Sequence, residues 1–185
     1  GRPSRRRRRM APTPRGHAAV AGAVPPHVAV RAAAAYGDVD EAQSAIGLAR
    51  AAAAPEVAEI LLIIESELWI VMAELACAPG QMQKLNDAGN RVTSSQVEHL
   101  EKLIDEITEK YEPPTEFVVP GGSEISARLD LARAVTRRAE RAVLAVVVED
   151  SQILPYLNRL ADLLWVMARW QEETSIASRS IRSSD

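Results

Sequence analysis

Apolar side chains recur at helical spacing along most of the chain, and this periodicity restricts the fold more than any other feature. In residues 55–78 they follow one another at steps of about three and four, which places them on one face of an α-helix. They are Ile60, Leu61, Ile64, Leu68, Val71 and Leu75. Pro55 suits the first turn of this helix and Pro79-Gly80 suits its end. The segment therefore predicts a long and substantially buried helix.

Four other segments share this spacing and have recognisable ends. Thr93 with Gln96 makes a capping-box pattern, and Ser123 after a glycine pair suits an N-cap. Asp150 or Ser151 can cap the last helix. The predicted ranges are about 32–53, 93–112, 123–148 and 151–174, with a polar loop over 79–92.

Five long helices joined by short connections favour an all-α, up-and-down five-helix bundle. The composition agrees, because only three Trp, three Tyr and one Phe occur and β-sheets draw on aromatic and β-branched residues. A chain of 185 residues suits one domain, which we place at residues 32–175. No apolar run approaches the ~20 residues that span a bilayer, so we expect no membrane partner. The single cysteine, Cys77, suits a reducing compartment.

The first 30 residues differ in composition from the rest. They combine the run Arg5 to Arg9 with five prolines, which predicts a disordered basic tail over 1–30; we also expect a frayed C-terminus over 176–185. From Asp38 onward the net charge is −11, so nucleic-acid binding is not expected of the domain and would depend on the tail. The arginine run is also compatible with a membrane-surface patch, a transit-like leader, or an accident of cloning or reading frame; we favour the last two.

Four arginines occupy fewer than three turns of the predicted helix 123–148. Arg133, Arg137 and Arg141 follow at steps of four and share one face, and Arg138 lies beside them. In one interpretation the face is solvated and salt-bridged, for example by Arg137 with Glu140. In the other it is a polyphosphate clamp, because the planar guanidinium binds phosphate oxygens with paired hydrogen bonds. The stripe alone leaves both open.

The last predicted helix has a polar face beside its apolar seam, formed by Asn158, Asp162, Trp165 and Arg169. HExxH, CxxC, GxSxG and Walker A patterns are absent, and His99 stands alone on its helix without Cys or carboxylate at ligand spacing. The sequence therefore predicts no metal ligands and no side-chain nucleophile.

Three segments in order make the chain resemble the propanediol-utilisation type of ATP:cob(I)alamin adenosyltransferase over about residues 34–172. They are Phe117-Val118-Val119-Pro120-Gly121-Gly122, the run AR-x-x-x-RRAER that begins at Ala132, and LPYLNRL-x-D, which begins at Leu154. The resemblance implies a ferritin-like, cobalamin adenosyltransferase-like five-helix bundle, a homotrimer and an active site between subunits. It also implies two substrates, ATP with Mg²⁺ and cob(I)alamin, whose reaction gives adenosylcobalamin and triphosphate.

The resemblance also implies roles for particular residues. Arg137 would contact the polyphosphate, assisted by Arg138 and Arg141. Arg133 would pair with Asp40 of a neighbouring subunit. Glu140, Asn158 and Asp162 would help hold the nucleotide and its magnesium-triphosphate, with Asp162 also near the corrinoid. Phe117 would lie beneath the corrin ring and keep the lower axial ligand off cobalt.

The sequence departs from this family near its N-terminus. Members carry a glycine-rich ATP loop of the kind T-x-x-G-D-x-G-x-T, whereas residues 9–17 here contain no Gly-Asp pair and no acidic residue. Two prolines there remove N–H donors that such a loop directs at phosphate. Either the loop has been lost or the first ~30 residues come from a shifted reading frame. Loss of the loop would impair the activity.

Two other functions stay open beside the enzyme. One is an adenosylcobalamin carrier without catalysis, and the other is a helical scaffold whose arginine tail binds nucleic acid. As an enzyme, the protein would supply a downstream adenosylcobalamin-dependent mutase. Its expected location is the cytoplasm in a bacterium or the mitochondrial matrix in a eukaryote.

Overall fold

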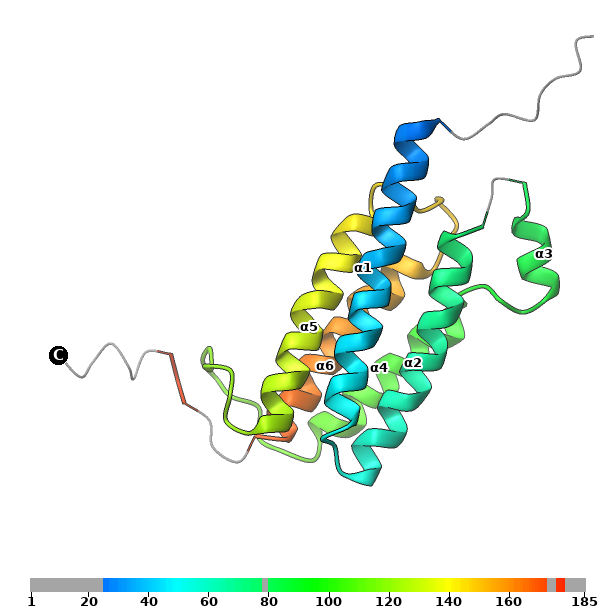
Figure 1. Cartoon of the computed structure of the whole chain (residues 1–185). Coiled ribbons are helices and arrows are strands. Elements are labelled where there is room, and N and C mark those ends of the chain that lie inside the picture. Colours follow the sequence, from blue (N-terminus) through cyan, green and yellow to red (C-terminus); the bar gives the residue numbers. More distant parts are fainter. Residues whose placement is uncertain (1–24, 78–79, 173–175, 179–185) are drawn as a thin grey trace, which may run out of the picture.

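The computed structural model describes residues 25–77, 80–172 and 176–178, which form six helices. Five are long: α1 (Pro26–Arg50), α2 (Pro55–Leu75), α4 (Ser94–Thr108), α5 (Glu124–Val143) and α6 (Ile153–Trp170). The sixth, α3 (Met82–Asp87), is short and stands to one side (Figure 1). Successive long helices run in opposite directions, which confirms the all-α up-and-down bundle.

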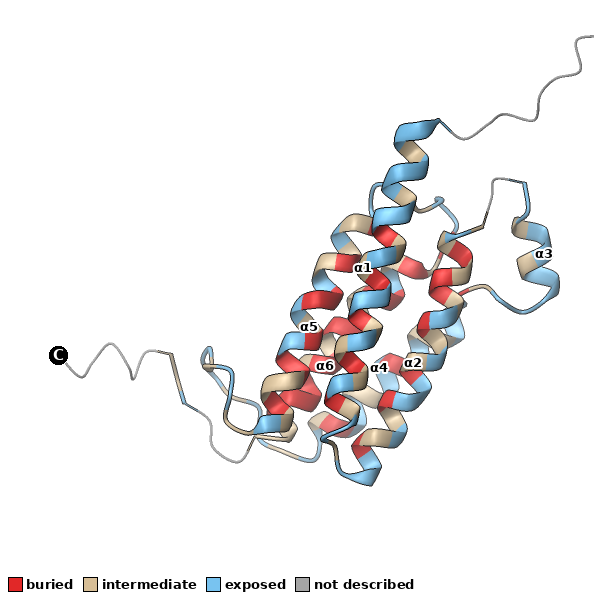
Figure 2. Cartoon of the chain, in the orientation of Figure 1, coloured by how far each residue is buried: buried red, intermediate tan, exposed pale blue. Residues whose placement is uncertain are grey.

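The core lies between the long helices, whose buried residues form stripes on their inward faces (Figure 2). α1 packs against α2 and α5, and α6 packs against α5 and α4. The largest fully buried side chains include Ile46, Leu61, Ile64, Leu68, Leu100, Leu129, Tyr156, Leu157 and Leu160. None of the described helices is both long and apolar enough to cross a membrane.

The predicted helix starts at Thr93 and Ser123 are confirmed. The Gln96 Oε1 accepts a hydrogen bond from the Thr93 N–H at 3.0 Å, as a capping box requires. The Ser123 hydroxyl accepts one from the Ser126 N–H at 3.1 Å. Before α6, the Ser151 hydroxyl accepts one from the Ile153 N–H at 3.2 Å. These contacts satisfy backbone donors that a helix start otherwise leaves unpaired.

Several predicted boundaries differ from the observed ones. α1 begins at Pro26 rather than near residue 32, because proline in the first turn loses an N–H that has no helical partner anyway. The predicted tail was therefore wrong for residues 26–30, while residues 1–24 lie outside the described part. α1 ends at Arg50 because Pro55 favours an extended conformation at Ala54.

Three other differences lie toward the C-terminal half. The predicted polar loop 79–92 contains α3. α5 ends at Val143, before a run of β-branched valines that form helix less readily. In the predicted frayed end, residues 176–178 instead pair with the Phe117 segment: the Val119 N–H donates to the Ile176 carbonyl at 2.9 Å. Residues 179–185 lie outside the described part.

Candidate functional site

A continuous chain of polar contacts joins the outer faces of α5 and α6. The Arg137 Nη1 lies 2.9 Å from the Glu140 Oε2, and the Asn158 Nδ2 donates to the Glu140 Oε1 at 2.9 Å. The Arg159 Nη2 then donates to the Asn158 Oδ1 at 2.7 Å and lies 3.1 Å from the Asp162 Oδ2. Four residues predicted from two separate segments are thus brought together.

Arg159 is the member of this chain that sequence reasoning missed. It stands inside the quoted LPYLNRL-x-D segment, three residues before Asp162, and this spacing allows an ion pair on one helical face. It connects Asn158 with Asp162, so its position beside two predicted site residues was the signal available.

The Arg137 side chain keeps donors available to an anion. It is 46 % exposed, whereas the Glu140 side chain that orients it is 17 % exposed. A guanidinium has five N–H donors, and the ion pair with Glu140 is made through Nη1. The Arg141 Nη1 donates to the Arg137 carbonyl at 2.9 Å and so lies one turn further along the same face. The arrangement suits a ligand that carries several negative charges.

Arg138 has a different environment from the other arginines of α5. Its Nε lies 3.1 Å from the Asp38 Oδ1, and its Nη2 pairs with Glu41, both on α1. The hydrogen bond to Glu41 raises the pKa of the Arg138 guanidinium. The structure therefore does not bring Arg138 into the chain of contacts with Asn158; its guanidinium joins α5 to α1.

A cavity of about 690 Å³ opens between the segment 114–120 and the neighbouring ends of α5 and α6. We name it the Phe117 cavity; its lining includes Phe117, Asp130, Arg133, Trp165 and Arg169. The Phe117 residue is 90 % exposed, although the Ser178 N–H holds its carbonyl at 2.8 Å. Because Arg133 precedes Arg137 by one helical turn, the arginine stripe begins at this cavity.

The predicted Arg133–Asp40 pair is not formed within one chain. The Arg133 Nε instead lies 3.3 Å from the Asp130 Oδ1 on its own helix. Asp40 is exposed on α1, and it pairs with no residue in the part of the chain that the structure describes. The prediction concerns two subunits, so it stays a prediction.

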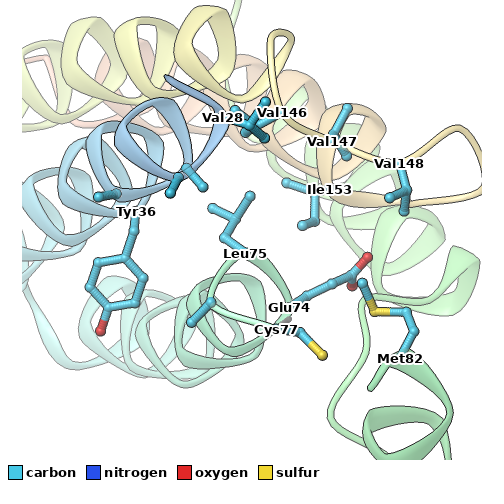
Figure 3. A pocket seen from close by; sticks show the side chains of 14 residues that line it. Val28, Tyr36, Glu74, Leu75, Cys77, Met82, Val146, Val147, Val148 and Ile153 are labelled. Carbon is cyan, nitrogen blue, oxygen red and sulfur yellow. The ribbon is translucent and has the colours of Figure 1, made fainter. Parts of the chain in front are cut away.

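A second cavity, of about 530 Å³, lies at the opposite end of the bundle and is mainly apolar. Leu75 from α2 and Ile153 from α6 point toward the space between the helices (Figure 3). Its one carboxylate, Glu74, is held by the Val92 N–H at 2.9 Å and the Ser151 hydroxyl at 2.6 Å. None of the predicted site residues lines it.

The described residues offer few protein ligands for Mg²⁺. Among the described residues, no group of three His, Cys, Asp or Glu side chains could hold a metal ion. Mg²⁺ in nucleotide sites takes most of its ligands from phosphate and water, with one or two carboxylates beside them. Glu140 and Asp162 are the carboxylates on the α5–α6 face that fit this smaller role.

Comparison with known proteins identifies related sequences. Residues 28–171 match the family described as cobalamin adenosyltransferase. A corrinoid adenosyltransferase of Mycobacterium leprae is 38 % identical over 144 residues, covering 73 % of this chain and 75 % of that protein. The corrinoid adenosyltransferase PduO of Salmonella typhimurium is 36 % identical over 152 residues, covering 80 % of this chain but only 44 % of its own longer sequence.

Solved structures show the same fold. One is a variant of the PduO-type ATP:corrinoid adenosyltransferase from Lactobacillus reuteri, complexed with cobalamin and ATP. Its TM-score is 0.70 at 25 % sequence identity, covering 80 % of this chain and 86 % of that one. A second variant of the same enzyme, complexed with ATP, has a TM-score of 0.64 at 27 % identity, covering 76 % and 80 % of the two chains.

Proposed function

Because the chain belongs to the cobalamin adenosyltransferase family, we propose that it transfers the 5′-deoxyadenosyl group of ATP to cob(I)alamin, releasing triphosphate. The observation that carries this proposal is the contact chain from Arg137 through Glu140 to Asn158, which begins one turn from the Phe117 cavity. An anion-binding face beside a large cavity with an exposed aromatic side chain suits a nucleotide and a bulky planar substrate together.

On the nucleotide side, Arg137 binds the polyphosphate, assisted by Arg141. Arg138 assists through its positive charge, while its guanidinium stays paired with Asp38 and Glu41 of α1. The triphosphate gains negative charge as its bond to the 5′-carbon breaks, so fixed cations stabilise the transition state. Glu140 and Asn158 orient Arg137 and contact the nucleotide. With Asp162, they complete the binding of magnesium-triphosphate.

On the corrinoid side, Phe117 provides an apolar surface. The residue is 90 % exposed, and a corrin ring that covered its phenyl group would remove apolar area from water. In that position the phenyl ring excludes the lower axial ligand and water from cobalt. Asp162 contributes at the edge of the corrinoid. The cofactor supplies the nucleophilic cobalt, and the protein orients it and excludes solvent.

The proposed enzyme is a homotrimer with its sites between subunits, in which Arg133 pairs with Asp40 of the neighbour. Arg133 is free to do so because its pairing with Asp130 uses Nε and leaves its side chain 34 % exposed. The product would pass to an adenosylcobalamin-dependent mutase. The relatives named above are bacterial, which supports the cytoplasm of a bacterium rather than a mitochondrial matrix as its location.

The test is an anaerobic assay of the full chain with ATP and chemically reduced cobalamin, followed by the absorbance of adenosylcobalamin. The proposal expects one triphosphate for each adenosylcobalamin. Retention of corrinoid without consumption of ATP would indicate a carrier instead. Residues 9–17 lie outside the described part of the structure. To test whether the missing ATP loop limits activity, the matched comparison is a variant in which a Gly-Asp-containing loop replaces residues 9–17. Higher turnover in that variant would show that low activity of the original chain is caused by the missing loop.

A further inference from the structure

The Asp130 carboxylate is almost fully buried on α5 at the wall of the Phe117 cavity, and its two oxygens bind different arginines. Oδ1 lies 3.3 Å from the Arg133 Nε, while Oδ2 pairs with the Arg169 Nη2 of α6. Only 4 % of the Asp130 side chain is exposed, against 34 % for Arg133. The carboxylate therefore joins a partly exposed cation, Arg133, to a buried one, Arg169, and both line the cavity.

Arg169 holds the Asp130 carboxylate in place, and we call this buried pair the anchor of Arg133. The Arg169 side chain is 3 % exposed, and its Nη2 also lies 2.8 Å from the Glu172 Oε1. Its guanidinium carbon is 5.9 Å from the centre of the Trp165 ring, which also lines the cavity. A buried cation of this kind cannot leave its carboxylates without a large desolvation penalty, so Asp130 has little freedom to turn.

The Asp130 carboxylate lies between two arginines. Its Oδ2 pairs with the buried Arg169 and its Oδ1 with Arg133, so the carboxylate that contacts Arg133 is itself held in place. This contact favours a fixed Arg133 side chain over one that moves freely in water. Without such an anchor, a long arginine side chain loses more rotamer entropy when it binds.

We propose that Asp130 is a positioning residue that fixes Arg133 at the wall of the Phe117 cavity in the orientation the adenosyl transfer needs. This inference rests on the proposed function. It differs from the Arg133–Asp40 pairing, since the anchor lies within one chain and is present before subunits meet. Asp130 itself touches neither substrate in this proposal and acts through Arg133.

A double-mutant cycle on the full chain tests the proposal. Asp130→Asn should lower kcat/KM by about 10- to 100-fold, because the Arg133 guanidinium loses its fixed orientation. On an Arg133→Ala background, the same change should cost no further activity. Equal losses of kcat/KM on both backgrounds would overturn the proposal, since they would show that Asp130 acts through general stability.

Glu172→Gln is the matched control. It removes the other carboxylate from the buried Arg169 and leaves the Arg133–Asp130 contact in place. It should lower the melting temperature and change kcat/KM by less than about threefold. If Glu172→Gln and Asp130→Asn lower kcat/KM equally, the positioning role is excluded.

Proton exchange at the arginine Nε–H groups tests the anchor without relying on turnover. Arg133 uses its Nε to pair with Asp130, whereas Arg137 pairs through Nη1. In ¹⁵N NMR, with the signals assigned by Arg133→Lys and Arg137→Lys, the Arg133 Nε–H should exchange at least about tenfold more slowly. Equal exchange rates would overturn the anchor. Slow exchange at Arg133 in a protein without adenosyl transfer would contradict the proposed function and leave the anchor standing.

Discussion

Glu140 on α5 and Asn158 on α6 are joined by a hydrogen bond of 2.9 Å, and the second carboxylate oxygen of Glu140 pairs with Arg137 at the same distance. One carboxylate is thus oriented by a neighbouring helix and in turn orients a cation. The position of Arg137 consequently depends on how α5 packs against α6.

Replacing Asn158 tests this dependence. Asn158→Ala removes a hydrogen bond to a charged group, which contributes roughly 1.5–3 kcal/mol, so we expect the KM for ATP to rise about tenfold. Steady-state kinetics at saturating cob(I)alamin would measure this. The control is Asn86→Ala on the exposed α3, which should leave KM unchanged. An unchanged KM in Asn158→Ala would contradict the orienting role.

Among the arginines of α5, Arg137 is expected to contribute most to stabilising the transition state through its charge. Arg137→Ala should lower kcat/KM for ATP by about 100-fold, since it removes a cation from the developing charge of triphosphate. Arg137→Lys should recover only part of this, because lysine keeps the charge without the planar fork. The control is Arg128→Ala on the same helix: Arg128 pairs with Glu124 and donates to the Leu48 carbonyl at 2.8 Å. A similar loss in Arg128→Ala would mean that the effect is not specific to Arg137.

Phe117 should matter for turnover and not for folding. Because the residue is 90 % exposed, Phe117→Ala should change the free energy of unfolding by less than about 0.5 kcal/mol. Adenosyl transfer should fall strongly, since the lower axial ligand would no longer be excluded from cobalt. Urea unfolding and the absorbance assay measure the two effects. Val30→Ala, at a residue 69 % exposed on α1, should change neither; an active Phe117→Ala protein would contradict the role.

The Tyr156 hydroxyl should make the free energy of unfolding depend on pH in alkaline solution. Burial, followed by the nearby charge of Glu67, raises the pKa of the Tyr156 hydroxyl well above its ordinary value of 10.0. Above pH 10 the unfolded chain loses this proton while the folded chain retains it, so the free energy of unfolding should fall as the pH rises.

Tyr156→Phe separates this contribution from others. It removes the 2.8 Å hydrogen bond to the Glu67 carboxylate, which should cost roughly 1.5–3 kcal/mol at pH 8. The difference from wild type should narrow between pH 9 and pH 11, because the variant has no proton to lose at this position. Urea unfolding across this range would measure it. A difference that stays constant with pH would refute the assignment.

Much of the helical architecture was predictable because its causes are local. The spacing that places Leu61, Ile64 and Leu68 on one face depends only on the helical repeat, and the cap at Ser123 depends on residues three apart. The prediction failed at residues 26–30 and at 176–178. There, proline tolerance in a first turn and pairing with a segment distant in sequence determine the conformation.

The site was predictable in part. The spacing of Arg137 and Glu140 indicated their ion pair, and the resemblance joined them to Asn158 and Asp162. The sequence did not reveal that Arg159 connects Asn158 with Asp162. It also did not reveal that Arg138 pairs with Asp38 on α1. Both depend on which rotamers the packed neighbours leave available.

The sequence by itself determined the helices, the buried face of each and the stripe of arginines on α5, because residue spacing and capping act within a few turns of chain. Tertiary structure decided which partner each arginine has: Glu140 for Arg137, α1 carboxylates for Arg138 and the buried Asp130 for Arg133. The physical reason is that an ion pair depends on distance and burial, which exist only after the helices have packed.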